Sequence, residues 1–132
     1  MNTPGGHFRR KKWDEMREVM GNGATLKVAS YELGCEELAF TMCKLEPGQS
    51  VAHHDHSKGV EAGAEEVYFL MEGKSQVRVN DEVYNAEAIE IFYFPPDAMR
   101  SVYNNSDKTS IWIFLAPMRA DFKEAYSEVE KG

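Results

Sequence analysis

The sequence is poor in several features that mark common classes of protein. Only two of its 132 residues are cysteines, and Cys35 and Cys43 are neither a CxxC pair nor enough for a disulfide framework. We therefore expect two reduced thiols and a cytoplasmic protein. The longest apolar run, Ile111 to Pro117, is far too short to cross a bilayer. Residues 1–12 also lack the apolar centre of a secretory signal.

A basic surface is missing as well. The formal net charge is −7, which argues against nucleic acid as a partner because phosphates favour a basic surface. The one basic cluster, Arg9 to Lys12, is followed at once by acidic residues and needs no partner as a solvated helix face. The glycine-rich phosphate-binding motifs and the G-x-S-x-G motif do not occur. Nucleotide binding and α/β-hydrolase chemistry therefore have no support.

What is present fits one small β domain. Hydrophobic residues make up 42% of the chain and aromatic residues 11%, enough for one continuous core in a chain of this length. Apolar residues then alternate with period two, and turn signals recur at the spacing of roughly 8–12 residues typical of an all-β sandwich or barrel. Strands are expected at 26–31, 38–45, 50–56, 65–71, 75–80, 82–84, 91–94, 101–104 and 110–116.

Two short helices are expected to flank this β region. Phe8, Trp13 and Met16 recur at near-helical spacing before a glycine-rich stop, and Phe122 and Tyr126 belong to a second such stripe. The expected organisation is an N-terminal helical arm, a β-barrel and a C-terminal helix, at residues 1–23, 24–117 and 118–132. We expect the two apolar stripes to pack onto the barrel or across a dimer interface.

Three histidines gather within four positions, at His53, His54 and His56. Because strand side chains alternate between faces, His54 and His56 should point one way and His53 the other. Ser50 and Ala52 should share the face of the two paired histidines and, being small, leave room beside the imidazoles. Two neutral imidazoles suit zinc, iron, nickel, copper or manganese.

This segment resembles the first motif of the small cupins. The motif runs from Gly48 through His54-Asp55-His56 to Glu66 and, after six intervening residues, Gly73. Nine residues separate His56 from Glu66, where the family has three or four. Glu61 stands at the shorter distance, but choosing it would place Tyr68 where the family has its turn glycine. The resemblance therefore implies Glu66 as the third metal ligand.

The second cupin motif is matched less well. It can be laid on residues 89–104, where Pro95 and Asn104 agree but Arg100 stands at the position of the family's last metal histidine. The resemblance covers about residues 38–116. It implies an all-β fold, the cupin double-stranded β-helix or jelly-roll barrel, frequent homodimers and a site for a divalent transition metal in the barrel mouth. It implies no particular reaction.

Arg100 leaves two accounts of the site open. A guanidinium stays protonated and cannot be a metal ligand. At about 6 Å from a divalent ion it would repel that ion by roughly 5 kcal/mol at an effective dielectric near 20. In one account metal binds and Arg100 holds an anionic group of the substrate against it. In the other, metal is lost and Arg100 forms a buried ion pair with Glu66.

Tyr68 shares the inward parity of Glu66 and could orient substrate or donate a proton, although packing alone also explains a buried tyrosine. Six large residues are expected to form most of the lining and core: Phe40, Met42, Phe92, Phe94, Trp112 and Phe114.

The favoured function is a metal-dependent enzyme acting on a small anionic molecule, of oxygenase, isomerase or lyase type, with no nucleic-acid or membrane partner. The ion at His54, His56 and Glu66 would act as a Lewis acid or an oxygen-binding centre. The alternatives are a non-catalytic or metal-free cupin that binds a sugar or carboxylate, and a metal-free isomerase or epimerase with His54 or His56 as base.

Overall fold

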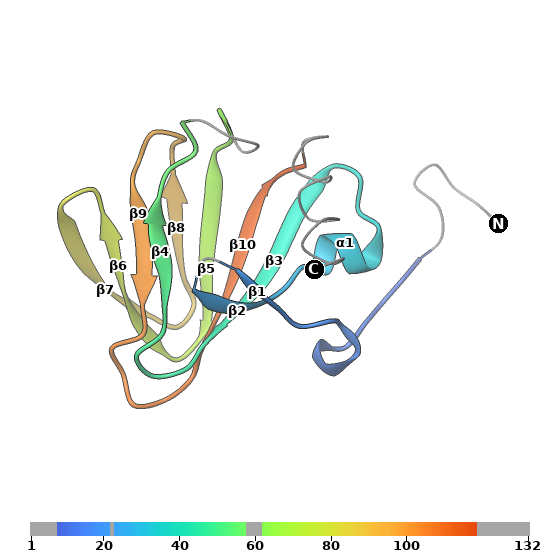
Figure 1. Ribbon diagram of the computed structural model, residues 1–132, viewed down its shortest axis with the longest axis horizontal. Coiled ribbons are helices and arrows are strands. Elements are labelled where there is room, and N and C mark those ends of the chain that lie inside the picture. Colours follow the sequence, from blue (N-terminus) through green and yellow to red (C-terminus); the bar gives the residue numbers. More distant parts are fainter. Residues whose placement is uncertain (1–7, 22, 58–61, 119–132) are drawn as a thin grey trace.

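The computed structural model describes residues 8–21, 23–57 and 62–118, which form two antiparallel sheets facing one another (Figure 1). The six-stranded sheet has the order β1-β2-β3-β10-β5-β8, and the four-stranded sheet has the order β4-β9-β6-β7. The strands are β1 Val19–Gly21, β2 Ala24–Lys27, β3 Leu38–Leu45, β4 Ser50–His54, β5 Glu66–Glu72, β6 Lys74–Val79, β7 Glu82–Glu87, β8 Glu90–Phe94, β9 Arg100–Tyr103 and β10 Ser110–Pro117.

The hydrophobic core lies between the two sheets. Burial alternates residue by residue along β3 and β10, as expected when one face of a sheet covers an apolar interior. Leu45, Leu70, Val77 and Trp112 are fully buried members of this core. The two sheets together form a jelly-roll barrel, so the expected fold class is confirmed.

Two of the six residues expected in the core face outward instead. Trp112, Phe114 and Phe94 are buried in the core, and Phe92 packs against it. Phe40 and Met42 are half-buried and alternate with the buried inward residues of β3. Because both faces of β3 are apolar, its sequence pattern does not distinguish inward from outward positions.

The expected N-terminal helix is wrong for the described residues. Only a single 3-10 turn forms, at Trp13–Glu15, and β1 follows it and pairs with β2 as a hairpin. The sequence Asn22-Gly23 is a strong hairpin signal, and Gly23 has a φ of +84°. Buried Lys27 holds the 3-10 turn in place, since its Nζ donates to the carbonyl of Trp13 at 2.6 Å and lies 4.3 Å from the Trp13 ring centre.

The strand expected at 26–31 also ends early. It stops at Lys27, and a short helix, α1 (Ala29–Leu33), follows. Gly34 ends this helix in the left-handed conformation at a φ of +69°, which glycine adopts without strain. The helix expected beyond residue 118 lies outside the described residues.

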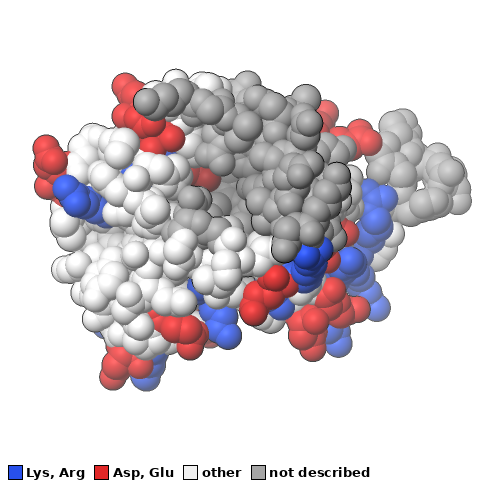
Figure 2. Space-filling model, viewed as in Figure 1, with Lys and Arg blue, Asp and Glu red and all other residues white. Residues whose placement is uncertain are grey.

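Charged side chains on the face seen in Figure 2 mix both signs, and a broad area between them carries neither. Among the described helices, none has the length and apolar character required to span a membrane.

Candidate metal centre

His54 points into the barrel because β4 contains a bulge. Val51 pairs with Val102 and His54 pairs with Arg100. Between these two pairs β4 advances by three residues while β9 advances by only two, so β4 contains one extra residue. An extra residue in one strand changes the facing of the residues that follow it. Val51 is therefore buried ahead of the bulge, and His54 shares the inward face with Arg100 after it.

Ser50 and Ala52 do not lie beside the imidazoles, so their small side chains leave no space there. Both of these side chains are exposed, because the bulge separates their facing from that of His54. The expectation of a shared face was therefore wrong.

His56 lies just beyond the end of β4 and is fully buried. Its backbone N–H donates to the carbonyl of Pro96 at 2.7 Å, and its own carbonyl accepts from the N–H of Gly63 at 2.9 Å. The His54 and His56 ring centres are 5.5 Å apart. The two imidazoles thus lie side by side as expected, but loop hydrogen bonds rather than strand alternation position the second one.

Glu66 opens β5 and brings its carboxylate to these rings. Its Oε1 lies 3.5 Å from His56 Nε2, and its side chain is 10% exposed. One ligand atom from each of His54, His56 and Glu66 can be chosen so that all three lie within 4.8 Å of one another. Glu61, the alternative weighed from the sequence, lies outside the described residues.

Backbone carbonyls determine which ring nitrogen carries the proton in both imidazoles. His54 Nδ1 lies 2.8 Å from the carbonyl oxygen of Ala52, and His56 Nδ1 lies 3.0 Å from that of Ala64. A carbonyl can only accept, so each Nδ1 must carry the proton and donate it. In the neutral rings, Nε2 therefore carries the lone pair, which is the form that binds a metal.

This donor set fits a divalent metal. The Nε2 lone pair of His56 and the Glu66 carboxylate are both electron-rich, and they face one another at 3.5 Å. Two such groups repel unless a proton or a cation lies between them. Two imidazoles and one carboxylate suit a transition metal with positions left open for other ligands.

Arg100 lies inside the site. Its guanidinium is fully buried and donates from Nη2 to Glu66 Oε1 at 3.1 Å. From Nη1 it donates to the carbonyl oxygens of Ala98 at 2.7 Å and Pro95 at 3.3 Å. These carbonyls anchor the positive charge beside the Glu66 carboxylate.

Tyr68 is the next inward residue of β5 and is buried among aromatic rings. Its ring centre lies 4.0 Å from that of Phe114 and 4.7 Å from that of Phe94. Burial raises the pKa of its hydroxyl well above the usual 10.0, and the nearby Glu66 carboxylate raises it further, whereas Arg100 acts in the opposite direction. Tyr68 is therefore a neutral hydrogen-bonding group at ordinary pH.

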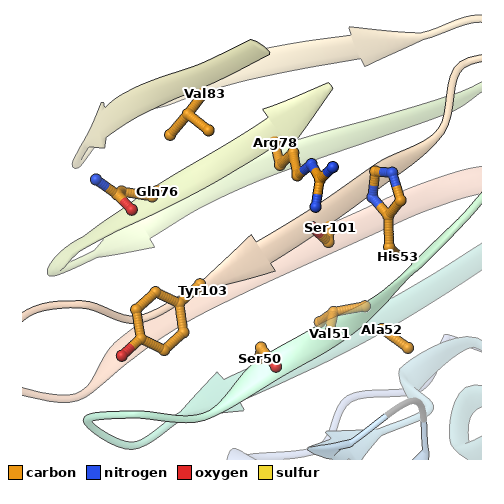
Figure 3. Close-up of a pocket in the computed structure, with 9 residues that line it drawn as sticks. All are labelled: Ser50, Val51, Ala52, His53, Gln76, Arg78, Val83, Ser101 and Tyr103. Atoms are coloured by element: carbon orange, nitrogen blue, oxygen red, sulfur yellow. The ribbon is translucent and has the colours of Figure 1, made fainter. Parts of the chain in front are cut away.

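Several polar side chains of the four-stranded sheet lie on its other face, away from the metal centre. Gln76, Arg78 and Tyr103 line an open groove of about 360 Å³ on the outer face of the four-stranded sheet (Figure 3). His53 lines it too, as expected for the histidine that faces away from the barrel interior. These residues do not contribute to the metal centre.

The sequence reasoning missed the groups that orient the site. These are backbone carbonyls of Ala52, Ala64, Pro95, Pro96 and Ala98. No side-chain pattern identifies a carbonyl, and the prolines at 95 and 96 signal only a turn.

Solved structures share this fold. A predicted oxalate decarboxylase from Thermotoga maritima is 16% identical, with a TM-score of 0.67 over 82% of this chain and 97% of that one. A cupin-superfamily sugar phosphate isomerase from Silicibacter pomeroyi is 13% identical, with a TM-score of 0.71 over 84% and 76%. A polyketide cyclase from Streptomyces resistomycificus is 15% identical, with a TM-score of 0.70 over 92% and 94%. At these identities the likeness concerns the fold alone.

A comparison with curated proteins found no match. The Cupin_2 family, described as a cupin domain, matches residues 41–116. That match includes all three residues of the candidate centre and covers more than half of the chain. The chain therefore belongs to the cupin family.

Proposed function

We propose that the protein is a metal-dependent enzyme that acts on a small anionic organic molecule at His54, His56 and Glu66. One observation carries the proposal: two imidazoles, each oriented by a backbone carbonyl at Nδ1, and one carboxylate bring ligand atoms within 4.8 Å of one another at one end of the barrel interior. A bound divalent ion would supply Lewis-acid polarisation or a centre for oxygen chemistry.

The residues of the chain would bind and orient the substrate around that centre. The carbonyls of Ala52 and Ala64 fix the direction of the imidazoles. The guanidinium of Arg100 would bind a carboxylate or phosphate group of the substrate, because charge-assisted hydrogen bonds to such groups are strong. Neutral Tyr68 would donate a hydrogen bond or a proton from its hydroxyl.

The reaction class stays open between oxygenase, isomerase and lyase chemistry. The solved relatives include a predicted decarboxylase, a sugar phosphate isomerase and a polyketide cyclase, which supports a small-molecule substrate. A fold shared at such low identity does not select one of these reactions.

A second candidate function is metal-free binding of a small ligand such as a sugar or carboxylate. The 3.1 Å contact between Arg100 and Glu66 favours it, since both side chains are almost fully buried and their charges already neutralise one another. The two candidates make opposite predictions about metal content.

Two further properties belong to the proposal. We infer a homodimer, which the family resemblance supports, and a cytoplasmic protein. The second inference is supported by the two cysteines, Cys35 and Cys43, which are both free thiols.

Calorimetric titration with Zn(II), Fe(II) or Ni(II) tests the metal proposal. We expect His54→Ala to weaken binding at least tenfold, since a ligand is lost, and His53→Ala to bind like the wild type. His53 is the matched control because it neighbours His54 but lines the outer groove. Equal, weak binding by the wild type and His54→Ala would contradict the proposal.

A further inference from the structure

The groove on the outer face of the four-stranded sheet carries hydrogen-bonding side chains in two rows. Arg78 of β6 pairs with Ser101 of β9 in the first row. In the second row, Gln76 pairs with Tyr103, which pairs in turn with Ser50 of β4. All five residues line the groove of about 360 Å³ (Figure 3). We refer to this groove as the outer groove.

The bulge in β4 adds a histidine to the first row. Between its two pairs with β9, β4 has Ala52 and His53 where β9 has only Ser101. Both of these β4 residues line the outer groove. Because β9 lies between β4 and β6, His53 and Arg78 flank Ser101 from its two sides (Figure 3). An imidazole, a hydroxyl and a guanidinium are thereby brought together at one end of the groove.

The charge of Arg78 is not neutralised within the described part of the chain. Its Nε donates to the carbonyl oxygen of Asn80 at 3.2 Å, which orients the guanidinium. No carboxylate among residues 8–21, 23–57 and 62–118 forms a salt bridge with Arg78. The described lining of the groove contains no aspartate or glutamate, although the chain has 22 of these against 15 lysines and arginines. A guanidinium in such a groove favours an anionic ligand.

His53 adds hydrogen-bonding capacity that the fold does not use. Its side chain is half-buried, and its Nδ1 is shielded from water without a hydrogen-bond partner among the described residues. A shielded polar atom without a partner costs free energy, which a bound group can recover. Imidazole, hydroxyl and guanidinium groups can all donate hydrogen bonds to the oxygens of a phosphate or carboxylate.

The other end of the outer groove suits the body of such a ligand. Tyr103 is 45% exposed and presents its ring at this end (Figure 3). Beside it, Gln76 Nε2 donates to Asn85 Oδ1 at 3.3 Å, which leaves the carbonyl oxygen of Gln76 to accept from a ligand hydroxyl. An aromatic face next to amide groups fits a ring that is apolar on one side and hydroxylated at its edge. The groove volume lies within the roughly 300–1,000 Å³ of small-molecule sites.

We propose that the outer groove binds a small hydroxylated ring, such as a sugar, that carries a phosphate or carboxylate group. Arg78, His53 and Ser101 would hold the anionic group, and Tyr103 would pack against the ring. The groove lies on the opposite face of the sheet from the metal centre. The inference therefore does not rest on the metal chemistry.

Titrations followed by nitrogen–proton correlation NMR locate the binding as well as measure it. The probes are glucose 6-phosphate, glucuronate, glucose and inorganic phosphate. We expect the better anionic sugar to bind with a dissociation constant on the order of 1 mM, and to shift the amide signals of Arg78 and Tyr103. Glucose should bind more weakly. Shifts confined to Glu66, Ala98 and Arg100 would place the anion inside the barrel and overturn the inference.

Replacing Arg78 tests the anionic end. Arg78→Gln should weaken glucose 6-phosphate and inorganic phosphate about tenfold, because a charge-assisted partner is lost. Lys74→Gln is the matched control, since it removes the same charge from the same strand but pairs with Glu87 outside the groove. It should leave both affinities unchanged, and equal weakening by the two variants would reduce the effect to net charge. Arg78→Lys keeps the charge without the planar fork and should give intermediate affinity.

Replacing Tyr103 tests the other end. Tyr103→Thr keeps a residue that favours a strand but removes the ring, so it should weaken glucose 6-phosphate about fivefold and leave inorganic phosphate unchanged. The same spectra show whether each variant keeps the wild-type fold. Unchanged binding of the sugar phosphate in Tyr103→Thr would overturn the placement of the ring. The absence of shifts in the outer groove with every probe at concentrations on the order of 10 mM would overturn the site itself.

Discussion

The two ends of the barrel interior are built from the same strands but differ in chemistry. At one end, β4, β5 and β9 present apolar side chains to the core, and at the other they present polar or charged ones. The apolar residues are Val51, Leu70 and Val102. The polar residues are His54, Glu66 and Arg100.

The apolar end of the barrel interior stabilises the fold, whereas the polar end serves the candidate site. Apolar burial contributes about 25 cal/mol per Å² removed from water, so the end that contains Leu70 favours folding directly. Buried charges lose hydration and recover it only through good hydrogen bonds, so apolar replacements of a buried ion pair are often neutral or stabilising. The polar end is therefore best explained by binding or chemistry.

The largest expected effect comes from removing one member of the ion pair. Arg100→Met should lower the free energy of unfolding by about 3–5 kcal/mol, because Glu66 is then left buried without its partner. Urea denaturation at neutral pH measures the change. Replacing both members, with Arg100→Met and Glu66→Leu together, should recover most of the loss. A double variant as unstable as the single one would show that the pair itself stabilises the fold.

The apolar end provides the control for that experiment. Leu70→Ala should also cost about 2–5 kcal/mol, through lost burial and a cavity. Its metal binding should equal that of the wild type, since Leu70 does not belong to the centre. A loss of metal in Leu70→Ala would mean that the two ends are not independent.

Arg100→His should shift the site toward metal. The change removes a fixed positive charge beside the ligands and adds an imidazole, so metal should bind at least tenfold more tightly, or about 1.4 kcal/mol. Small carboxylates should bind more weakly, because the guanidinium is lost. Arg100→Lys should keep metal affinity low and give intermediate carboxylate affinity. Calorimetry on the wild type and the two variants measures both affinities, and unchanged metal affinity in Arg100→His would refute this role.

The smallest expected effect concerns Tyr68, which lies between the two ends. Tyr68→Phe should cost about 1 kcal/mol in unfolding free energy at neutral pH, the usual net value of one hydrogen bond. Metal affinity should not change, since Tyr68 is not in the ligand set. A large loss of metal in this variant would place the hydroxyl among the groups that hold the ion.

Alkaline pH adds a second readout for Tyr68. Its pKa is raised well above 10.0 by burial, so the folded state keeps a proton that the unfolded chain releases, and stability falls as the pH rises above 10. Burial likewise raises the pKa of Cys43 from 9.0 to about 12, which makes stability decline from pH 9 onward in both proteins. The additional decline above pH 10 should be absent from Tyr68→Phe in urea unfolding.

The central strands could be predicted well from the sequence, and the segment before β2 could not. The expected strand at 38–45 matches β3 residue for residue, because its mostly apolar run is long and ends just before the turn residues Pro47-Gly48. Near the N-terminus, a few apolar residues at near-helical spacing were outweighed by the hairpin that Asn22-Gly23 favours.

For the candidate site, the sequence identified the residues better than their geometry. His54, His56 and Glu66 do converge, and Arg100 does contact Glu66. The bulge in β4 could not be foreseen, since one extra residue leaves no mark on composition or turn signals. The carbonyls that orient the rings depend on the folded loops and have no signature in the sequence.

Metal content of the protein as isolated tests the central claim most directly. The protein should be purified without an affinity tag or added metal and examined by elemental analysis, beside His54→Ala and His53→Ala prepared in the same way. We expect a divalent transition metal in the wild type and in His53→Ala, and its loss from His54→Ala. A wild type that carries no more metal than His54→Ala would contradict the metal centre and favour the metal-free function, with Arg100 and Glu66 as a structural ion pair.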